Sequence, residues 1–294
     1  MNRFHLAYLT ANDKRFAADY LHFRNMTRRS PGVQTVLLTI VVSRSRPVSA
    51  FDLASVERIV GCTRDCPWLD VRGVLWKGNL GRDFSSAAVA LNDISGIVQE
   101  SDYVMVRNRS AFGPLTENWY RQYVDQYNRH PATGLVGSTI NLIGHPLRPD
   151  VEDTPHVQSY IYLSQWKHLG PMAKDYPGSR RADRLDVVVE GEIGLSRQIM
   201  ADGQQISCLN WPEHAFSADG PVPSSLPRRD IKRMALRLPF RYKYGSYYFS
   251  RSSILGLIVW MLHLLKSSTV SRSGRHAPSR SVHDVPDYDL DAQA

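Results

Sequence analysis

The sequence predicts an α/β protein with a mostly parallel central sheet flanked by helices. Short apolar runs rich in β-branched residues recur along the chain, and a stretch with helical spacing separates most of them from the next. Polar, turn-forming residues follow the runs directly, as they do at the carboxyl ends of strands in open α/β sheets. With 294 residues, 43% of them hydrophobic and 22% charged, the chain is long and apolar enough for one large globular domain.

The N-terminal region is expected to be helical. Phe16, Tyr20 and Phe23 recur at helical spacing within residues 11–26, so residues 1–30 are interpreted as a helical lead. The same region lacks the long apolar core of a signal peptide, which favours a cytoplasmic location.

The predicted sheet lies in a domain at residues 31–215. Buried parallel strands are near-continuous apolar runs, and the β-branched run at 35–42 is the clearest of these. A helix is expected to begin near Ser49. Strands are predicted at residues 35–42, 71–76, 103–106, 134–140, 156–163, 185–189 and 206–209. Helices are predicted at residues 51–60, 85–98, 116–128 and 193–201, the third with an aromatic face that favours core packing over ligand binding.

The composition changes after about residue 216. Residues 216–253 form a basic and aromatic C-terminal extension. Residues 254–266 are expected to form an apolar helix, which is too short for a membrane span because a span needs about 20 residues. This helix could lie in a membrane interface as a peripheral contact, or pack as a core helix; both interpretations stay open. Residues 267–294 are rich in Ser and Arg, then in Asp, and are predicted to be a disordered tail.

Charge and cysteine content narrow the class of protein. The formal net charge of +8 favours anionic partners such as nucleotide phosphates, nucleic acid or an acidic membrane face. Cys62, Cys66 and Cys208 are too few and too unevenly spaced for a disulfide framework or a zinc site.

Two polar loops are the candidate ligand site. After the 71–76 run come Asn79, Gly81, Arg82 and Asp83, and the loop after the 103–106 run places further polar residues at the same edge of the sheet. Ligands of open α/β sheets bind beyond the carboxyl ends of the strands, and the amides at the start of the next helix favour phosphate. The sequence therefore predicts a nucleotide or phosphate site; the second loop contributes Asn108, Arg109 and Ser110.

Four segments, taken in order, resemble predicted glycosyltransferases of the GT-A type from bacteria, algae and large algal viruses. They are NLGRDF at 79–84, VRNRSAFGP at 106–114, GSTI at 137–140 with HVQS at 156–159, and EIGLSRQIMADG at 192–203. The last is also similar to the acidic motif of family-2 glycosyltransferases, and the likeness covers roughly residues 33–212. It implies a GT-A-like domain that binds a nucleotide sugar and transfers a hexosyl or deoxyhexosyl group in polysaccharide biosynthesis.

The resemblance gives Glu192 the role of general base in an inverting transfer. A carboxylate can take the proton of the acceptor hydroxyl as that oxygen attacks the anomeric carbon. Glu192 is expected to open a helix, where the helix dipole would stabilise its ionised form, but an acid at that position can equally be a helix cap. Glu190 is the substitute if the register is off by two residues.

The same resemblance leaves the metal open. Many GT-A enzymes carry Asp-x-Asp where this chain has Asn108, Arg109 and Ser110, whose neutral oxygens are poor ligands for Mg²⁺ or Mn²⁺. Either Asn108 holds a divalent cation weakly, or Arg107, Arg109 or Arg82 neutralises phosphate in its place.

Other positions have a functional and a structural interpretation. Asp83 could bind the nucleoside or cap the helix that follows. His156 and Gln158 could contact the acceptor or a phosphate, whereas a lone histidine is more often structural. Trp211 and His214 could line the acceptor cleft.

The leading hypothesis is a glycosyltransferase with a nucleotide-sugar donor and a glycan or lipid-linked acceptor, cytoplasmic or peripheral on the inner face of a membrane. The alternative is a non-catalytic GT-A-like binding subunit of a glycan-assembly complex, because Asp-x-Asp is missing. A nucleic-acid binder is not expected, since no recognition motif accompanies the basic, aromatic segment at 228–251.

Overall fold

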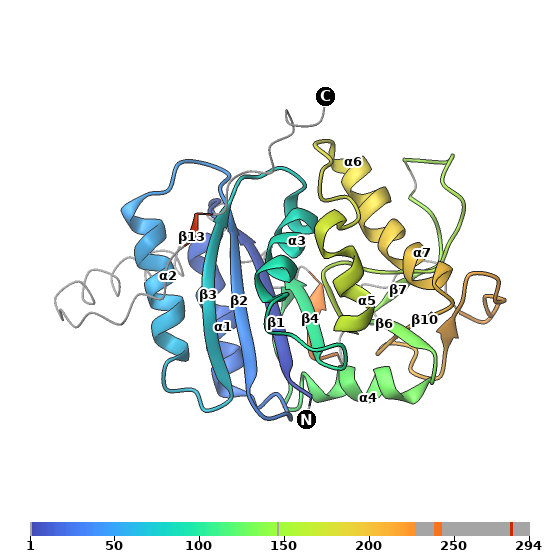
Figure 1. Cartoon of the computed structure of the whole chain (residues 1–294), viewed down its shortest axis with the longest axis horizontal. Coiled ribbons are helices and arrows are strands. Elements are labelled where there is room, and N and C mark those ends of the chain that lie inside the picture. Colours follow the sequence, from blue (N-terminus) through green and yellow to red (C-terminus); the bar gives the residue numbers. More distant parts are fainter. Residues whose placement is uncertain (1, 146, 227–237, 243–282, 285–294) are drawn as a thin grey trace.

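One sheet of nine strands forms the centre of the computed structural model in the part of the chain that it describes, residues 2–145, 147–226, 238–242 and 283–284 (Figure 1). The strand order is β11-β10-β6-β9-β4-β1-β2-β3-β13. The strands are β1 (Phe4–Ala11), β2 (Val36–Ser43), β3 (Leu69–Lys77), β4 (Tyr103–Asn108), β6 (Thr133–Gly137), β9 (Ile161–Gln165), β10 (Gln205–Cys208), β11 (Ala215–Phe216) and β13 (His283–Asp284).

Most neighbouring strands are parallel. β3, β2, β1 and β4 pair in parallel, as do β6 and β10, whereas β9 runs antiparallel to both β4 and β6. Two small sheets lie beside the large one: β5 (Ala111–Phe112) with β12 (Arg241–Tyr242), and β7 (Ile140–Asn141) with β8 (His156–Val157). The predicted α/β class with a mostly parallel sheet is confirmed.

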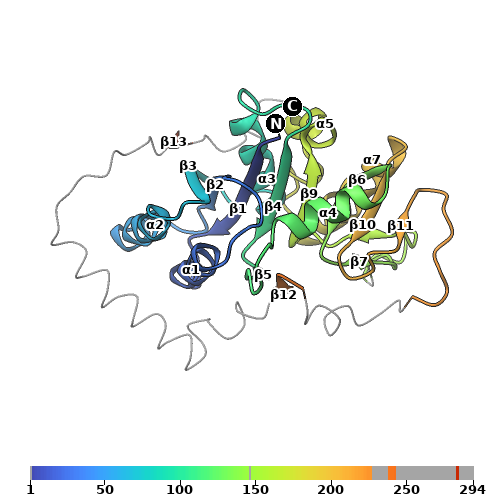
Figure 2. The same ribbon diagram turned by 90° about the horizontal axis from the view of Figure 1, so that it is seen from below.

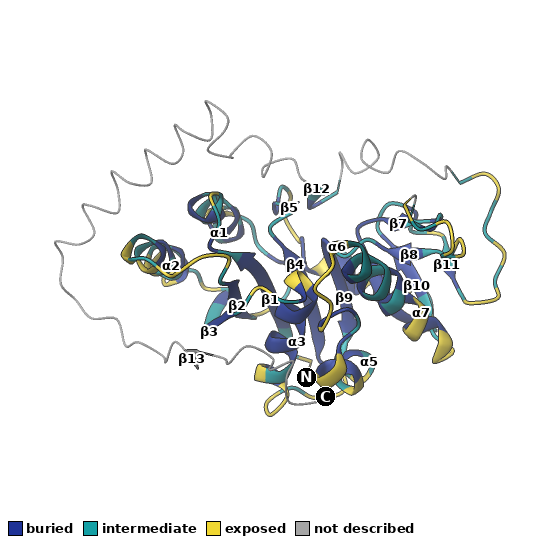
Figure 3. Ribbon diagram, turned by 90° about the horizontal axis from the view of Figure 1, so that it is seen from above, coloured by how far each residue is buried: buried dark blue, intermediate teal, exposed yellow. Residues whose placement is uncertain are grey.

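Helices cover both faces of the sheet (Figure 2). One apolar core includes side chains of α1 (Tyr20–Arg28), α2 (Ala50–Thr63) and α4 (Arg121–Arg129), and the other includes those of α3 (Arg82–Ile94), α5 (Trp166–Leu169) and α7 (Gly194–Ala201). The strands between them are mostly buried (Figure 3). The remaining helical segments are η1 (Phe16–Asp19), η2 (Gly170–Asp175), α6 (Arg184–Asp186) and the π-helical η3 (Val187–Ile193).

The strand order reverses at the centre of the sheet. From β1 the chain continues to β2 and β3 on one side, and β4 then pairs with β1 on the other. Such a reversal of strand order makes the loops at the carboxyl ends of β1 and β4 diverge, and ligands of open α/β sheets bind there.

Local patterns predict most elements correctly. The predicted strands at 35–42, 71–76, 103–106, 134–140 and 206–209 correspond to β2, β3, β4, β6 and β10, and the predicted helices to α2, α3, α4 and α7. Ser49 caps α2 through a reciprocal pair of hydrogen bonds with Asp52, which explains why the helix begins there. The predicted strand at 156–163 is divided between β8 and β9. The aromatic face of α4 is core packing: Tyr123 is fully buried.

Two expectations are wrong. The expected helical lead contains β1, a buried strand with a parallel partner on each side, and helical structure begins only at Phe16. The predicted strand at 185–189 is helical instead: Asp183 caps α6, and the helix continues through η3 into α7. Three consecutive valines favour a strand, but the Asp183 cap and burial of Val187 on the α3 side of the sheet favour a helix.

The C-terminal predictions are only partly described. Residues 254–266 lie outside the described residues, as does the predicted tail apart from β13. Phe240, from the predicted extension, is fully buried against Trp119 and Tyr123. The domain boundaries at 30, 215 and 253 stay predictions. Among the described helices none combines the length and apolarity that a membrane span requires.

Candidate functional site

Asp83 and Asn108 meet at the carboxyl end of the sheet. Asn108 ends β4 and its Nδ2 donates to Asp83 Oδ2 at 2.7 Å, while its Oδ1 accepts from the amide of Ser110 at 2.8 Å. Asp83 lies in the first turn of α3 but makes no capping hydrogen bond, so the interpretation as a helix cap is wrong. The two loops predicted to form one site are therefore in direct contact.

The Asp83 carboxyl is accessible and yet crowded. The residue is exposed, but surrounding protein atoms displace part of its hydration, and this desolvation raises the pKa of Asp83 above its ordinary value. The hydrogen bond from Asn108 and the nearby charges of Arg109 and Lys77 oppose the rise. A carboxyl that is both accessible and perturbed is typical of a functional site.

Gly81 shapes the loop before α3. It is left-handed at φ 62°, its amide donates to the carbonyl of Arg181, and an added Cβ would lie 1.8 Å from the carbonyl oxygen of Ser179. Only glycine fits this position. Its amide is therefore engaged within the protein, and the role of Gly81 is to join the 79–83 loop to the 179–181 segment.

Asn79 and Arg82 are exposed, as is Asp83 in the same loop. Arg82 is left-handed at φ 50°, which is uncommon for a residue with a side chain, and it has no ion-pair partner among the described residues. Of the three candidates Arg82, Arg107 and Arg109, Arg82 is therefore the cation that is available to an anion at the carboxyl end of the sheet.

Arg107 and Arg109 do not point to a phosphate site. Arg107 is fully buried between the rings of Tyr8 and Phe240, at 5.0 and 4.7 Å from their centroids, and donates to the carbonyl of Ala111 and to His22 Nδ1. Burial lowers the pKa of Arg107 to about 10. Its role is structural.

Arg109 lies inside the fold at the carboxyl end of β1. Its guanidinium pairs with Asp13 and with the fully buried Asp19, whose Oδ1 lies 2.7 Å from Nε, and it also donates to Thr10. Burial raises the pKa of the Asp19 carboxyl, and Arg109 opposes that rise. The expectation that Arg107 or Arg109 replaces a metal ion at the phosphate is therefore wrong, because both cations are used inside the fold.

Glu192 lies in the middle of a continuous helix, within η3, and not at a helix N-terminus. The expected help from the helix dipole and the capping interpretation are both wrong for this reason. Its Oε2 accepts from the amide of Ser159 at 2.9 Å and from the hydroxyl of Ser159 at 2.5 Å. Its Oε1 lies 3.7 Å from Nε2 of His156, and the side chain is 18% exposed.

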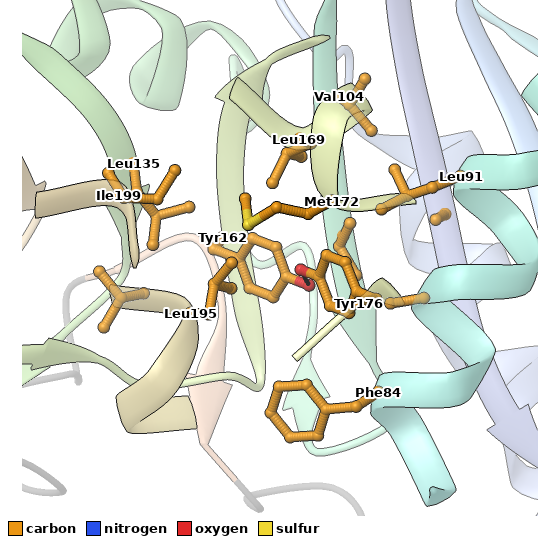
Figure 4. Close-up of a cluster of buried hydrophobic side chains, with 14 of the residues drawn as sticks. Phe84, Leu91, Val104, Leu135, Tyr162, Leu169, Met172, Tyr176, Leu195 and Ile199 are labelled. Carbon is orange, nitrogen blue, oxygen red and sulfur yellow. Dashed lines mark hydrogen bonds between the residues drawn. The ribbon is translucent and has the colours of Figure 1, made fainter. Parts of the chain in front are cut away.

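The Glu192 region and the Asp83–Asn108 pair adjoin each other. The amide of Asn108 donates to the carbonyl of Tyr160, the residue after Ser159. Gly191 packs so tightly on the ring of Phe84 that an added Cβ would lie 2.6 Å from it. Next to Phe84, the hydroxyl groups of Tyr162 and Tyr176 are hydrogen-bonded to each other in the buried cluster (Figure 4). The segments around residues 83, 108, 159 and 192 therefore lie together at the carboxyl end of the sheet.

His156 and Gln158 lie at this edge with different exposure. His156 is 3% exposed and its Nδ1 is hydrogen-bonded to the carbonyl of Thr154 at 2.8 Å, so it lies behind Glu192 and cannot contact an acceptor in this arrangement. Gln158 is partly exposed, and its Oε1 accepts from Thr139 at 2.9 Å. Trp211 is 8% exposed and belongs to the core, which contradicts the interpretation as a cleft residue.

The residues present do not fit a tightly held divalent cation. No group of three or more His, Cys, Asp or Glu side chains suited to a metal gathers in the described residues. The oxygen of Asn108 already accepts from Ser110, its nitrogen faces Asp83, and Lys77 places a positive charge near the same carboxyl. Hard divalent cations prefer oxygens from several carboxylates, whereas the pair of Asp83 and Asn108 provides a single carboxylate.

The sequence reasoning missed Ser159 and Lys77. Ser159 was within the HVQS segment, but a serine gives no signal of the carboxylate that it will hold. Lys77 ends β3, is 3% exposed and donates to the carbonyl of Leu80, so its charge stays close to the 79–83 loop. Its position directly after an apolar run was the available signal.

Comparisons with known proteins give limited matches. No protein-family model matches the chain, and no curated protein matches it. Among solved structures it is similar to the mannosyltransferase PcManGT from Pyrobaculum calidifontis in complex with GDP-Man and Mn²⁺, with 12% identity and a TM-score of 0.45 over 95% of this chain and 67% of that one. It is also similar to the apo structure of the bifunctional glycosyltransferase WbbM, with 10% identity and a TM-score of 0.40 over 71% of this chain and 39% of that one. At this level of similarity neither structure assigns an activity to the chain.

Proposed function

We propose that this chain is a GT-A-type glycosyltransferase that transfers a sugar from a nucleotide-sugar donor to a glycan or lipid-linked acceptor. One observation supports it above the others: segments around Asp83, Asn108, Ser159 and Glu192, which resemble that family and are far apart in sequence, adjoin at one edge of the sheet. Motifs that serve one ligand site have to adjoin in space in this way.

Glu192 is the general base in this proposal. Its Oε2 is held by Ser159, which leaves Oε1 to take the proton of the acceptor hydroxyl. The acceptor oxygen forms a bond to the anomeric carbon, the bond from that carbon to the donor phosphate breaks, and the nucleoside diphosphate leaves with the bonding electrons. Attack opposite the leaving group inverts the configuration of the anomeric carbon.

Asp83, Asn108 and Ser110 would contact the nucleotide, with Asn79 and Arg82 at the same loop. Gly81 contributes by shaping that loop. Arg82 is the exposed cation that could neutralise part of the diphosphate charge. No step in this proposal runs through a divalent cation, because the donor set at Asp83 and Asn108 does not suit one.

Glu192→Gln tests the assignment. The amide keeps the shape of the side chain but cannot take a proton, so transfer should fall by about 10²–10⁴-fold while nucleotide binding persists. Glu190→Gln is the matched control. Glu190 lies two residues from Glu192 on the same helix, is 43% exposed and pairs with Arg181, so its variant should keep parental activity. Full activity in Glu192→Gln would refute the role of Glu192.

The non-catalytic alternative makes a different prediction. A binding subunit would be stabilised by a nucleotide sugar without hydrolysing or transferring it. The full chain should therefore be incubated with a panel of nucleotide sugars while donor hydrolysis and thermal stabilisation are both recorded. Stabilisation by a donor that is never turned over, with any acceptor, would favour the alternative.

A further inference from the structure

The Glu192 carboxylate is held asymmetrically. Both hydrogen bonds from Ser159, one from the amide and one from the hydroxyl, end on Oε2. Oε1 accepts no hydrogen bond from the described protein atoms and lies 3.7 Å from Nε2 of His156. The side chain is 18% exposed, so it is not sealed from solvent. The fold thus separates an anchored oxygen from one that accepts no hydrogen bond from the described protein atoms.

His156 is oriented toward Oε1 by its other nitrogen. Nδ1 lies 2.8 Å from the carbonyl of Thr154, and a carbonyl only accepts, so the hydrogen belongs on Nδ1. In the neutral ring Nε2 then carries a lone pair toward Glu192, and in the protonated ring it carries an N–H. At 3% exposure the ring has little access to solvent, so it borders Oε1 from the protein interior.

We propose that Ser159 is a positioning residue for Glu192: its amide and hydroxyl fix Oε2, so that Oε1 is left for the acceptor hydroxyl. The inference rests on the proposed function, in which Glu192 is the base.

Other charged groups near Glu192 have partners of their own. Asp83 lies on α3, which packs against η3, and is engaged with Asn108. Glu190 on the same helix is paired with Arg181. Arg197, one turn further along, is held by Thr154 and by the carbonyl of Glu152.

Ser159→Ala is the first test. Removing a hydroxyl that donates to a charged group should lower kcat about 10- to 100-fold with little change in KM. Ser159→Thr keeps a hydroxyl and should restore most of the lost kcat.

Ser164→Ala is the control, because Ser164 is fully buried and its hydroxyl donates to the carbonyl of Gly134, not to a carboxylate. It should leave kcat near the parental value even if stability falls.

The outcomes separate this inference from the proposed function. If Glu192→Gln abolishes transfer while Ser159→Ala keeps the parental kcat, or if Ser159→Thr fails to restore a lowered kcat, the positioning role is refuted and the base assignment stands. If Glu192→Gln retains full activity, the proposed function fails first.

Discussion

The two interpretations of Arg109, a phosphate ligand or an internal cation, predict opposite behaviour for Arg109→Ala. The structure favours the internal role, since the guanidinium pairs with Asp13 and with Asp19, whose side chain is 0% exposed. Removing one partner of a buried ion pair leaves an uncompensated charge and typically costs about 3–5 kcal/mol. We therefore expect the free energy of unfolding to fall by that amount, measured by urea denaturation at pH 7.

The pH dependence of that loss follows from Asp19. Without Arg109, burial alone acts on the carboxyl, and its folded-state pKa should rise further above the unfolded value of about 3.9. A folded state that binds the extra proton is most stable at low pH and loses stability as pH rises through the raised folded-state pKa. The difference in unfolding free energy between parent and variant should accordingly shrink as the pH is lowered toward 4.

Arg121→Ala is the control for the same change at the surface. Arg121 and Asp125 are both 58% exposed and form an i,i+4 pair, which contributes at most about 0.5 kcal/mol. An Arg109→Ala variant that unfolds at the parental urea concentration, yet binds nucleotide more weakly, would show that Arg109 serves the ligand and that the internal role is mistaken.

Two further predictions concern glycine geometry and buried histidine. Gly81→Ala should cost about 1–2 kcal/mol for the left-handed backbone and about 1–3 kcal/mol more for the clash with Ser179, whereas Gly203→Ala, at φ 77° with open space, should cost only the first amount. Equal thermal shifts for the two variants would contradict the close packing of the 79–83 loop. Burial, with the charge of Arg107 next, lowers the pKa of His22 well below its ordinary 6.5, so its contribution to stability is present above pH 6.5 and is lost as the pH falls further. His22→Gln should make the decline of unfolding free energy between pH 6.5 and 5 shallower by up to about 1.4 kcal/mol per pH unit, and an unchanged slope would rule out a neutral buried His22.

Some of the fold was predictable because the information is local. The run at 36–43 is continuous and β-branched because both faces of β2 are covered, and Ser49 with Asp52 specifies the start of α2 without help from distant residues. By contrast β1 mixes His5, Tyr8 and Thr10 into its apolar residues, so its central place depends on the strands and helices that cover it.

The candidate site divides in the same way. The sequence by itself identified the polar residues at strand ends, Asp83 and Asn108 among them, and the acidic residue Glu192. Strand ends and motifs can be recognised from residues that are neighbours in the chain. Only the tertiary structure decided which charges face the site: Arg109 turns inward to Asp19, and Ser159 reaches Glu192 across 33 positions of the chain. The reason is physical, because the partner of a charge is chosen by packing in space, which nothing in its local sequence specifies.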